Sequence, residues 1–447
     1  MAEPGTEQDV FKIVVVGGGA GGLELVTELG KRYRRDDSVS VTLIDATSSH
    51  LWKPLLHEVA AGTLNSNDDE LSYLAQGHWN HFTFRLGALE SIDRAAKTLA
   101  ISPSYDAEGR EYIPRRELSY DTLVISVGSL TNDFGIEGVR EHCMFLDSRE
   151  QADLFHKRLV RDCYTANTQE APLREGQLHV AIAGAGATGV ELAAELHDSI
   201  RELVSYGLER IDPQRDVRIH IVEASEKILP SLPDRISERT TAALEAMGVV
   251  LHTGEFVTRA TADAFETKSG KRIPAEIKVW AAGIGGPDVL AGLDGLETNR
   301  INQLVVRGTL QTTQDDDIFA LGDCAACPIE NSYENTVPPR AQAAHQQATH
   351  VAEAIKALRE GRTVGEFSYN DYGSLINLSQ RGTVGTLMGN LLGKRAGRLS
   401  VEGLMARTMY KSLYKMHQVA VQGWLRTTLL TVANALTHRS KPRMKLH

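Results

Sequence analysis

Cysteine is scarce in this sequence, with four residues in a chain of 447. Cys143, Cys163, Cys324 and Cys327 are too few and too irregularly spaced for the disulfide framework of a secreted protein, so we expect a reducing compartment inside the cell. Long apolar runs are also missing. No stretch of about 18 uninterrupted apolar residues occurs, which argues against a helix that spans a membrane. Any membrane contact would therefore be peripheral.

Positive charge is not in excess, because 48 Lys and Arg stand against 58 Asp and Glu and give a net charge of −10. The basic residues are spread along the chain until its last ten residues, so no nucleic-acid partner is expected. The acidic start leads directly into a strand-like segment and predicts neither a secretory signal nor a transit peptide. With 42% apolar and 24% charged residues, the composition predicts a folded protein of two or three domains.

Glycine, by contrast, is concentrated in two runs. The first, from Gly17 to Gly22, follows a strand-like segment at 11–16 and leads into a segment with helical spacing. About 20 residues later, a second strand-like segment at 39–45 ends in Asp45, which closes a strand–helix–strand unit of the expected size. The sequence therefore predicts a Rossmann-like dinucleotide-binding unit here.

The same plan recurs further along the chain. A strand-like segment at 177–183 precedes the run from Gly184 to Gly189, a helical pattern follows, and a strand-like segment at 217–223 ends in Glu223. In such turns the first glycine allows the tight reversal, the second lets a pyrophosphate approach the backbone, and the third lets helix and strand pack closely. The phosphates then lie at the helix N-terminus, which favours anions.

The two acids predict what each unit binds. Asp45 and Glu223 can each accept both hydroxyls of an adenosine ribose and would repel a 2′-phosphate. No arginine occurs at 224–227, which favours NADH over NADPH, although Lys227 leaves the strictness open. Two dinucleotide sites in one chain indicate hydride transfer between a bound flavin and an exchanging nicotinamide nucleotide.

The order of the sites follows from a late segment at 318–323, whose Gly322-Asp323 pair can place an acid against the ribityl hydroxyls of a flavin. This segment could complete the first unit, so one unit would be inserted in the other. The predicted fold is α/β, with an FAD-binding domain at 1–150 and 285–370, an NADH-binding domain at 151–284, and a C-terminal region at 371–447.

At this point the sequence resembles the bacterial type II NADH dehydrogenases, the single-subunit respiratory NADH:quinone oxidoreductases, over nearly its whole length. Six segments carry the resemblance, and together they are highly specific. They are GGGAGG at 17–22, HLWKPLLHEVA at 50–60, GATGVEL at 186–192, VWAAG at 279–283, GDC at 322–324 and PPRAQAAHQ at 338–346.

The resemblance implies a homodimer held on the cytoplasmic face of the bacterial inner membrane, which reduces a quinone without pumping protons. It also implies that Glu191 faces the nicotinamide and flavin rings and that Gln342 and Gln346 flank the quinone pocket. The residues that would hold FAD are Gly17, Gly19, Gly22, Asp45, Lys53 and Asp323. Those that would hold NADH are Gly184, Gly186, Gly189 and Glu223.

Several side chains allow more than one interpretation. Glu191 could steer the nicotinamide or relay a proton with a raised pKa, or it could be a first-turn acid stabilised by the helix dipole. Gln342 and Gln346 lie four residues apart, so both amides share one helix face, where they could donate to a quinone or simply meet solvent. Lys53 could lie beside the flavin ring, while His50 and His57, on either side of it, fit ordinary packing equally well.

Cys324 and Cys327 have the spacing of a redox pair or of half a zinc site, but no second pair accompanies them. We therefore predict no metal site and leave copper binding or an unreactive pair as alternatives. No cysteine occurs at 39–60, where the disulfide-reductase relatives carry their redox pair, which argues against that activity.

The end of the chain has the pattern of amphipathic helices with basic flanks, typical of a segment that lies in the headgroup layer of an anionic membrane. A core or dimer-interface helix is the alternative. The apolar positions are Met405, Met409, Leu413, Met416, Ala420, Trp424, Leu425, Leu429, Val432 and Leu436, and the basic ones are Arg407, Lys411, Lys415, Arg439, Lys441, Arg443 and Lys445.

Two other functions remain open from the sequence. One is a soluble NADH-dependent flavin reductase that uses another acceptor. The other is a non-catalytic NAD-binding sensor.

Overall fold

The computed structural model describes residues 10–66, 70–106, 108–329, 332–379, 382–387 and 399–437. The first glycine run directly follows β1, the central strand of a five-stranded parallel sheet. The strands lie in the order β22-β11-β1-β2-β5, and every neighbouring pair is parallel. Their bounds are β1 (Phe11–Val16), β2 (Val39–Asp45), β5 (Thr83–Leu86), β11 (Thr122–Ile125) and β22 (Ile318–Ala320).

The late strand β22 pairs with β11, so a segment close to residue 320 completes the sheet that begins at residue 11. The apolar side chains of β1 and β11 are buried on both faces, as expected for parallel strands covered on both sides. This pairing is what an inserted second unit requires. The predicted domain boundaries themselves stay a prediction.

The second glycine run occupies the same place in a four-stranded parallel sheet with the order β15-β14-β13-β19. The strands are β13 (His179–Ala183), β14 (Arg218–Glu223), β15 (Val250–Thr253) and β19 (Ile277–Trp280). Strand β13 begins two residues later than the sequence predicted, because Arg174 to Gln177 form a turn before it. The two sheets are therefore built on one plan.

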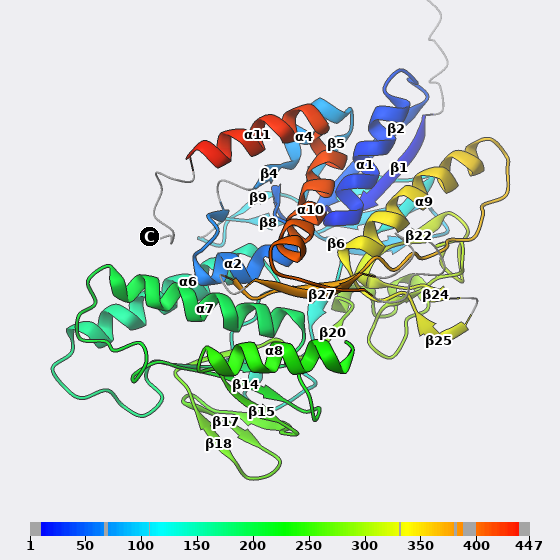
Figure 1. Cartoon of the computed structure of the whole chain (residues 1–447). Helices are drawn as coiled ribbons and strands as arrows, with labels where there is room; N and C mark the ends of the chain where they lie inside the picture. Colours follow the sequence, from blue (N-terminus) through cyan, green and yellow to red (C-terminus); the bar gives the residue numbers. More distant parts are fainter. Residues whose placement is uncertain are drawn as a thin grey trace, which may run out of the picture.

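Helices α1 (Ala20–Tyr33) and α7 (Ala187–Ser205) begin after β1 and β13 and pack against the two parallel sheets (Figure 1). The long helix α6 begins at a capping box in which Ser148 and Gln151 satisfy each other's backbone amides. Within the described residues, the helices up to residue 359 include α1 (Ala20–Tyr33), α2 (Leu56–Ala61), α4 (Tyr73–Asn80), α5 (Val139–His142), α6 (Arg149–Thr168), α7 (Ala187–Ser205), α8 (Asp234–Ala246) and α9 (Ala341–Arg359). Short 3-10 turns are η1 (Lys53–Leu55), η2 (Asp288–Leu290), η3 (Leu293–Gly295) and η4 (Gly322–Cys324).

Smaller sheets and ribbons fill the edges of both units. One three-stranded sheet consists of β6 (Leu89–Asp93), β7 (Thr98–Ile101) and β10 (Arg116–Ser119), and another of β16 (Val257–Ala260), β17 (Ala264–Thr267) and β18 (Arg272–Pro274). The two-stranded pairs are β3 (Ser49–His50) with β4 (Leu71–Ser72), β8 (Ser104–Tyr105) with β9 (Glu111–Ile113), β12 (Leu130–Thr131) with β20 (Ile284–Gly285), β21 (Leu304–Val305) with β23 (Ala325–Ala326), and β24 (Pro328–Ile329) with β25 (Ser332–Thr336).

The C-terminal region forms an antiparallel sheet and two helices. The sheet consists of β26 (Gly373–Asn377), β27 (Thr383–Leu387) and β28 (Leu399–Glu402), and the helices are α10 (Gly403–Gln422) and α11 (Trp424–Thr437). This sheet lies between α7 and α8 on one side and α10 on the other, while α10 also packs against α1 (Figure 1). The region therefore joins the two dinucleotide-binding units instead of hanging from one of them.

Helix α11 presents its apolar side chains to the outside. Trp424, Leu425, Leu429 and Val432 are all more than half exposed, so a core role is wrong for them. No helix within the described residues is both long enough and apolar enough to cross a bilayer. Arg439, Lys441, Arg443 and Lys445 lie outside the described residues, as do the side chains of Met405, Arg407, Met409, Lys411, Leu413 and Leu436.

Candidate functional site: two dinucleotide turns and the junction between them

The first glycine turn is shaped by contacts that leave no room for a side chain at two of its positions. Gly17 has φ +99°, and a Cβ there would lie 2.3 Å from the Ser126 carbonyl oxygen. A Cβ at Gly22 would lie 1.9 Å from the Gly17 carbonyl oxygen. At Gly19, a Cβ would meet nothing within 4 Å. The turn is therefore closed towards the protein and open at its second predicted binding glycine, as pyrophosphate binding requires.

The second turn repeats this arrangement. Gly184 has φ +103° and lies against Ala281, and a Cβ at Gly189 would lie 2.1 Å from the Gly184 carbonyl oxygen. A Cβ at Gly186 again meets nothing within 4 Å. Helices α1 and α7, which are fully described, begin without a side-chain cap and without an acid in the first turn. Their first amides are therefore suited to a bound anion.

The two predicted acids are fixed by the turns themselves. Asp45 Oδ2 accepts a hydrogen bond from the Gly18 amide at 2.6 Å, and Glu223 Oε2 accepts one from the Ala185 amide at 2.7 Å. Each second carboxylate oxygen accepts an amide two residues further on, from Thr47 or from Ser225. The carboxylates are thus held at the strand ends, close to where an adenosine ribose would follow the pyrophosphate.

Lys53 and Asp323 both form a hydrogen bond with Ser129, a residue of the first unit. Lys53 Nζ donates to the Ser129 carbonyl at 2.7 Å and lies 3.3 Å from Asp147 Oδ1. The Ser129 hydroxyl donates to Asp323 Oδ2 at 3.0 Å. Burial raises the pKa of Asp323 above its ordinary value, against the lowering effects of Ser129 and Lys53. The structure thus brings together two predicted residues that are 270 positions apart.

Glu191 lies where α7, α2 and β26 meet, and its side chain is buried. Its Oε1 accepts the Asn377 amide at 2.9 Å, and its Oε2 lies 3.8 Å from His57 Nδ1. Burial raises the pKa of Glu191 to about 8, with smaller contributions of the same sign from Glu58 and Glu195. Glu191 is the fifth residue of α7, outside its first turn, so the helix-dipole interpretation is wrong. The carboxyl can hold a proton near neutral pH.

Gln342 and Gln346 do lie on one face of α9, but both amides are already engaged. Gln342 donates to the Gly373 carbonyl at 3.1 Å and accepts the Tyr372 amide at 3.1 Å. Gln346 donates to and accepts from the Asn370 backbone, both at 2.9 Å. The two glutamines therefore fasten the segment at 370–373, which leads into β26, to the start of α9.

Cys324 and Cys327 are buried, and both thiols are free. Cys324 and Cys327 form no disulfide, and burial raises the pKa of each thiol to about 12. A thiol with so high a pKa is a poor nucleophile and a poor metal ligand. Across the described ranges, no group of three or more His, Cys, Asp or Glu side chains is arranged to hold a metal ion.

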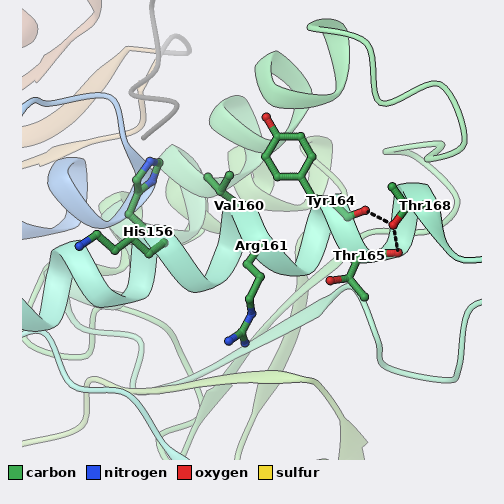
Figure 2. Close-up of a pocket in the computed structure, with 7 residues that line it drawn as sticks. His156, Val160, Arg161, Tyr164, Thr165 and Thr168 are labelled. Carbon is green, nitrogen blue, oxygen red and sulfur yellow. Dashed lines mark hydrogen bonds between the residues drawn. The ribbon is translucent and has the colours of Figure 1, made fainter.

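A surface cavity of about 410 Å³ lies elsewhere, along α6 (Figure 2). All of its lining residues come from this one helix, and Thr168 uses its hydroxyl on the carbonyls of Tyr164 and Thr165. It contains none of the predicted site residues. The cavity is therefore separate from the chemistry that the two turns support.

Sequence reasoning missed several partners of the site. Ser129 and Asp147 hold Lys53, and the Tyr73 hydroxyl donates to the Gly18 carbonyl at 2.7 Å. None of them belongs to a recognisable motif, and each reaches the site only through the tertiary fold. Asn377, the partner of Glu191, lies in a strand of the C-terminal sheet for which the sequence offered no functional signal.

Known proteins share this fold and these turns. Residues 11–348, well over half of the chain, match the family Pyridine nucleotide-disulphide oxidoreductase. Among solved structures, NDH2 from Plasmodium falciparum in complex with NADH has a TM-score of 0.80 at 19% identity, covering 98% of this chain and 99% of that one. The sulfide:quinone oxidoreductase of Aquifex aeolicus has a TM-score of 0.69 at 19% identity, covering 97% and 96%. These structural likenesses define the class by its fold.

Sequence relatives narrow the class. The type II NADH:quinone oxidoreductase of Haemophilus influenzae is 42% identical over 447 residues, which cover 97% of this chain and 99% of that protein. The enzyme of the same name from Staphylococcus aureus strain NCTC 8325 is 31% identical over 396 residues, covering 87% and 93%. The chain therefore belongs to the type II NADH:quinone oxidoreductases, within the pyridine nucleotide-disulphide oxidoreductase family. The predicted family and the predicted two-unit fold are confirmed.

Proposed function

We propose that this chain is an FAD-dependent NADH:quinone oxidoreductase that takes a hydride from NADH and reduces a membrane quinone without pumping protons. The duplicated turns are the observation that carries the proposal. Each has an open second glycine, an uncapped helix and a fixed acid. Relatives named type II NADH:quinone oxidoreductase, up to 42% identical, support the same reaction.

The first unit is assigned to FAD. Gly17, Gly19 and Gly22 would hold the pyrophosphate, Asp45 the ribose, and Asp323 the ribityl chain, while Lys53 places a positive charge beside the ring. When bound, the flavin supplies the two-electron chemistry that connects NADH to quinone. The open space at Gly19 and the unshielded α1 N-terminus fit this group.

The second unit is assigned to NADH, with Gly184, Gly186 and Gly189 at the pyrophosphate and Glu223 at the ribose. Lys227, which left NADPH open, donates to Asp234 Oδ1 at 2.6 Å and to the Leu232 carbonyl. Because its ammonium is held there, Lys227 is not directed at a 2′-phosphate. This arrangement supports a preference for NADH.

We place Glu191 at the junction of the two assigned sites, where it would supply or accept a proton during quinone reduction. A carboxyl with a pKa of about 8 is mostly protonated near neutral pH, which suits a general acid. We place Gln342 and Gln346 at the rim of the quinone pocket. There they hold the segment at 370–373 in position instead of offering free amides to the quinone.

We further propose that the protein is a homodimer bound peripherally to the cytoplasmic face of the inner membrane through α11. Its exposed Trp424, Leu425, Leu429 and Val432 form an apolar surface that the rest of the described residues leave uncovered. Arg426 lies 3.8 Å from the centre of the Trp79 ring, so α11 is attached to α4. Because the proposed quinone acceptor dissolves in the lipid bilayer, a protein bound to the membrane surface can reach it directly.

Stopped-flow spectroscopy tests the reaction directly. NADH should bleach the flavin absorbance of the purified protein, and a quinone should restore it in a second step. A colourless protein that still binds NADH would favour the sensor alternative. A flavin that bleaches with NADH but does not recover with quinone would favour a reductase with another acceptor.

Deletion of residues 424–447 tests the membrane assignment. The truncated protein should keep its flavin and its NADH-driven bleaching but lose binding to anionic lipid vesicles. Replacement of Leu74, an exposed apolar residue on α4, by Ser is the matched control for loss of apolar surface outside α11. Equal vesicle binding by the truncated and full-length proteins would contradict the assignment.

A further inference from the structure

A chain of hydrogen-bonded ionisable side chains connects helix α10 to the first glycine turn, and no step of the proposed reaction uses it. His345 on α9 and His417 on α10 both contact the Glu24 carboxylate on α1 through their Nδ1 atoms, the second at 2.5 Å. His417 Nε2 lies 3.0 Å from His50 Nε2, and His50 Nδ1 lies 3.0 Å from the Gly18 carbonyl oxygen. Glu24, His50 and His417 are all buried.

The acceptors at the two ends fix how many protons the histidine pair carries. The Gly18 carbonyl can only accept, so His50 Nδ1 must donate to it. The Glu24 carboxylate can only accept, so His417 Nδ1 must donate to it. The Nε2 contact between the rings needs one further proton. Three protons on four ring nitrogens give the pair one positive charge.

That charge belongs to His417. Burial and the neighbouring His417 lower the pKa of His50 to about 3, so His50 is the neutral ring and its Nε2 accepts. Burial alone would raise the pKa of Glu24, but the hydrogen bonds from His345 and His417 bring it below its ordinary value. Glu24 is therefore the carboxylate that balances a buried imidazolium on α10.

The surroundings of His417 fit a cation. The Trp52 ring lies 4.2 Å from the His417 ring in a T-shaped arrangement, and aromatic rings attract buried cations. Among the described side chains, the charged or titratable groups that hydrogen-bond to His417 are Glu24 from α1 and His50 from β3, and His345 on α9 contacts the same Glu24 carboxylate. On α10 itself, Lys415 donates to Gln418 at 2.7 Å.

At its other end, this series of hydrogen bonds reaches the first glycine turn at Gly18. The Gly18 carbonyl receives both His50 Nδ1 and the Tyr73 hydroxyl. In a trans peptide the carbonyl and the next amide point in opposite directions, so holding the Gly18 carbonyl aims the Gly19 amide away from these donors. A carbonyl cannot pass a proton on, so the chain positions the turn and is not a proton path.

We propose that His417 is a positioning residue whose imidazolium fastens α10 to Glu24 and, through His50, holds the Gly18 peptide in the orientation that binds the flavin pyrophosphate. The inference rests on the proposed assignment of this turn to FAD. Flavin retention should therefore depend on a side chain of the C-terminal region, almost 400 residues from the turn.

The first test is the protonation state of the native, full-length holoenzyme. Nitrogen NMR of protein labelled at histidine with ¹⁵N should show a ring with both nitrogens protonated that belongs to His417. That signal should be missing in His417→Phe and present in Lys415→Gln, which removes a cation two residues away. Only neutral rings in the native spectrum, or a doubly protonated ring that persists unchanged in His417→Phe, would overturn the proposal.

The second test is flavin loss during dilution. His417→Phe keeps an aromatic ring against Trp52 but removes both N–H donors, so the flavin should dissociate about ten-fold faster or more. The rate in Lys415→Gln, which leaves the histidine pair intact, should stay at the native value. A native-like rate in His417→Phe would overturn the proposal. If no form bound flavin, the FAD assignment would fail, and the NMR spectrum would still decide the charge.

Discussion

The two glycine turns have nearly the same backbone but are held in different ways. In both, the amide after the first glycine donates to the acid at the end of the neighbouring strand, at 2.6 Å and 2.7 Å. The carbonyl of Gly18 is held by Tyr73 and His50 from other elements, whereas the carbonyl of Ala185 accepts only a backbone amide, that of Leu229, among the described contacts. A turn clamped from outside suits a resident cofactor, and one without such a clamp suits a nucleotide that exchanges.

The largest expected effect is that of valine at Gly19 or Gly186, because each substitution should affect only one of the two nucleotide sites. Gly19 and Gly186 have extended backbone angles that valine tolerates, and neither has an atom within 4 Å of a Cβ, so both variants should fold. Gly19→Val should be purified without flavin. Gly186→Val should stay yellow but lose about 5- to 150-fold in kcat/KM for NADH, the effect of about 1–3 kcal/mol of overpacking.

Flavin absorbance and steady-state NADH oxidation measure both variants, and each is the control for the other. Circular dichroism checks that the folds are intact. The assignment of the two sites would be reversed if Gly186→Val were colourless and Gly19→Val kept its flavin.

The features of the two turns that lie close together in the sequence were predictable from it. The glycine spacing, the strand that precedes it and the acid about 20 residues later are all encoded within one short unit, so Asp45 and Glu223 could be named in advance. The contacts that hold the Gly18 carbonyl could not, because Tyr73 and His50 reach it from separate elements and His417 acts only through His50. Likewise, the shared face of Gln342 and Gln346 was predictable, but their partner segment at 370–373 has no motif.

Glu191, at the junction between the two units, should make both stability and activity depend on pH. Its pKa of about 8 means that the native state keeps a proton that the unfolded chain releases above about 4.5. The free energy of unfolding should therefore fall as pH rises between these values, and Glu191→Gln should remove that fall. If the protonated form is the active one, flavin reoxidation by quinone should slow above about pH 8.

Stopped-flow reoxidation at a series of pH values measures this effect. Glu191→Gln should be slower by about 100-fold at neutral pH and should lose the alkaline limb, because a general acid contributes at least that much. Glu202→Gln, on the same helix but bonded to Tyr206, is the matched control and should behave as the native protein. An alkaline limb that persists in Glu191→Gln would show that another group titrates.

The smallest expected effect concerns which nucleotide the unclamped turn accepts. Asp234→Ala removes the carboxylate partner of Lys227 and leaves its ammonium, only four residues from Glu223, with the Leu232 carbonyl. A released lysine can attract a 2′-phosphate, so the ratio of kcat/KM for NADPH to that for NADH should rise by up to about 5-fold, the value of an exposed ion pair of at most about 1 kcal/mol.

The double variant Asp234→Ala/Lys227→Ala identifies the cause. It should return to the native ratio, because the Lys227 ammonium is then missing and cannot offset the repulsion between Glu223 and a 2′-phosphate. A raised ratio that survived in the double variant would mean that loss of the Asp234 charge acts by itself, and that Glu223 alone does not set the preference for NADH.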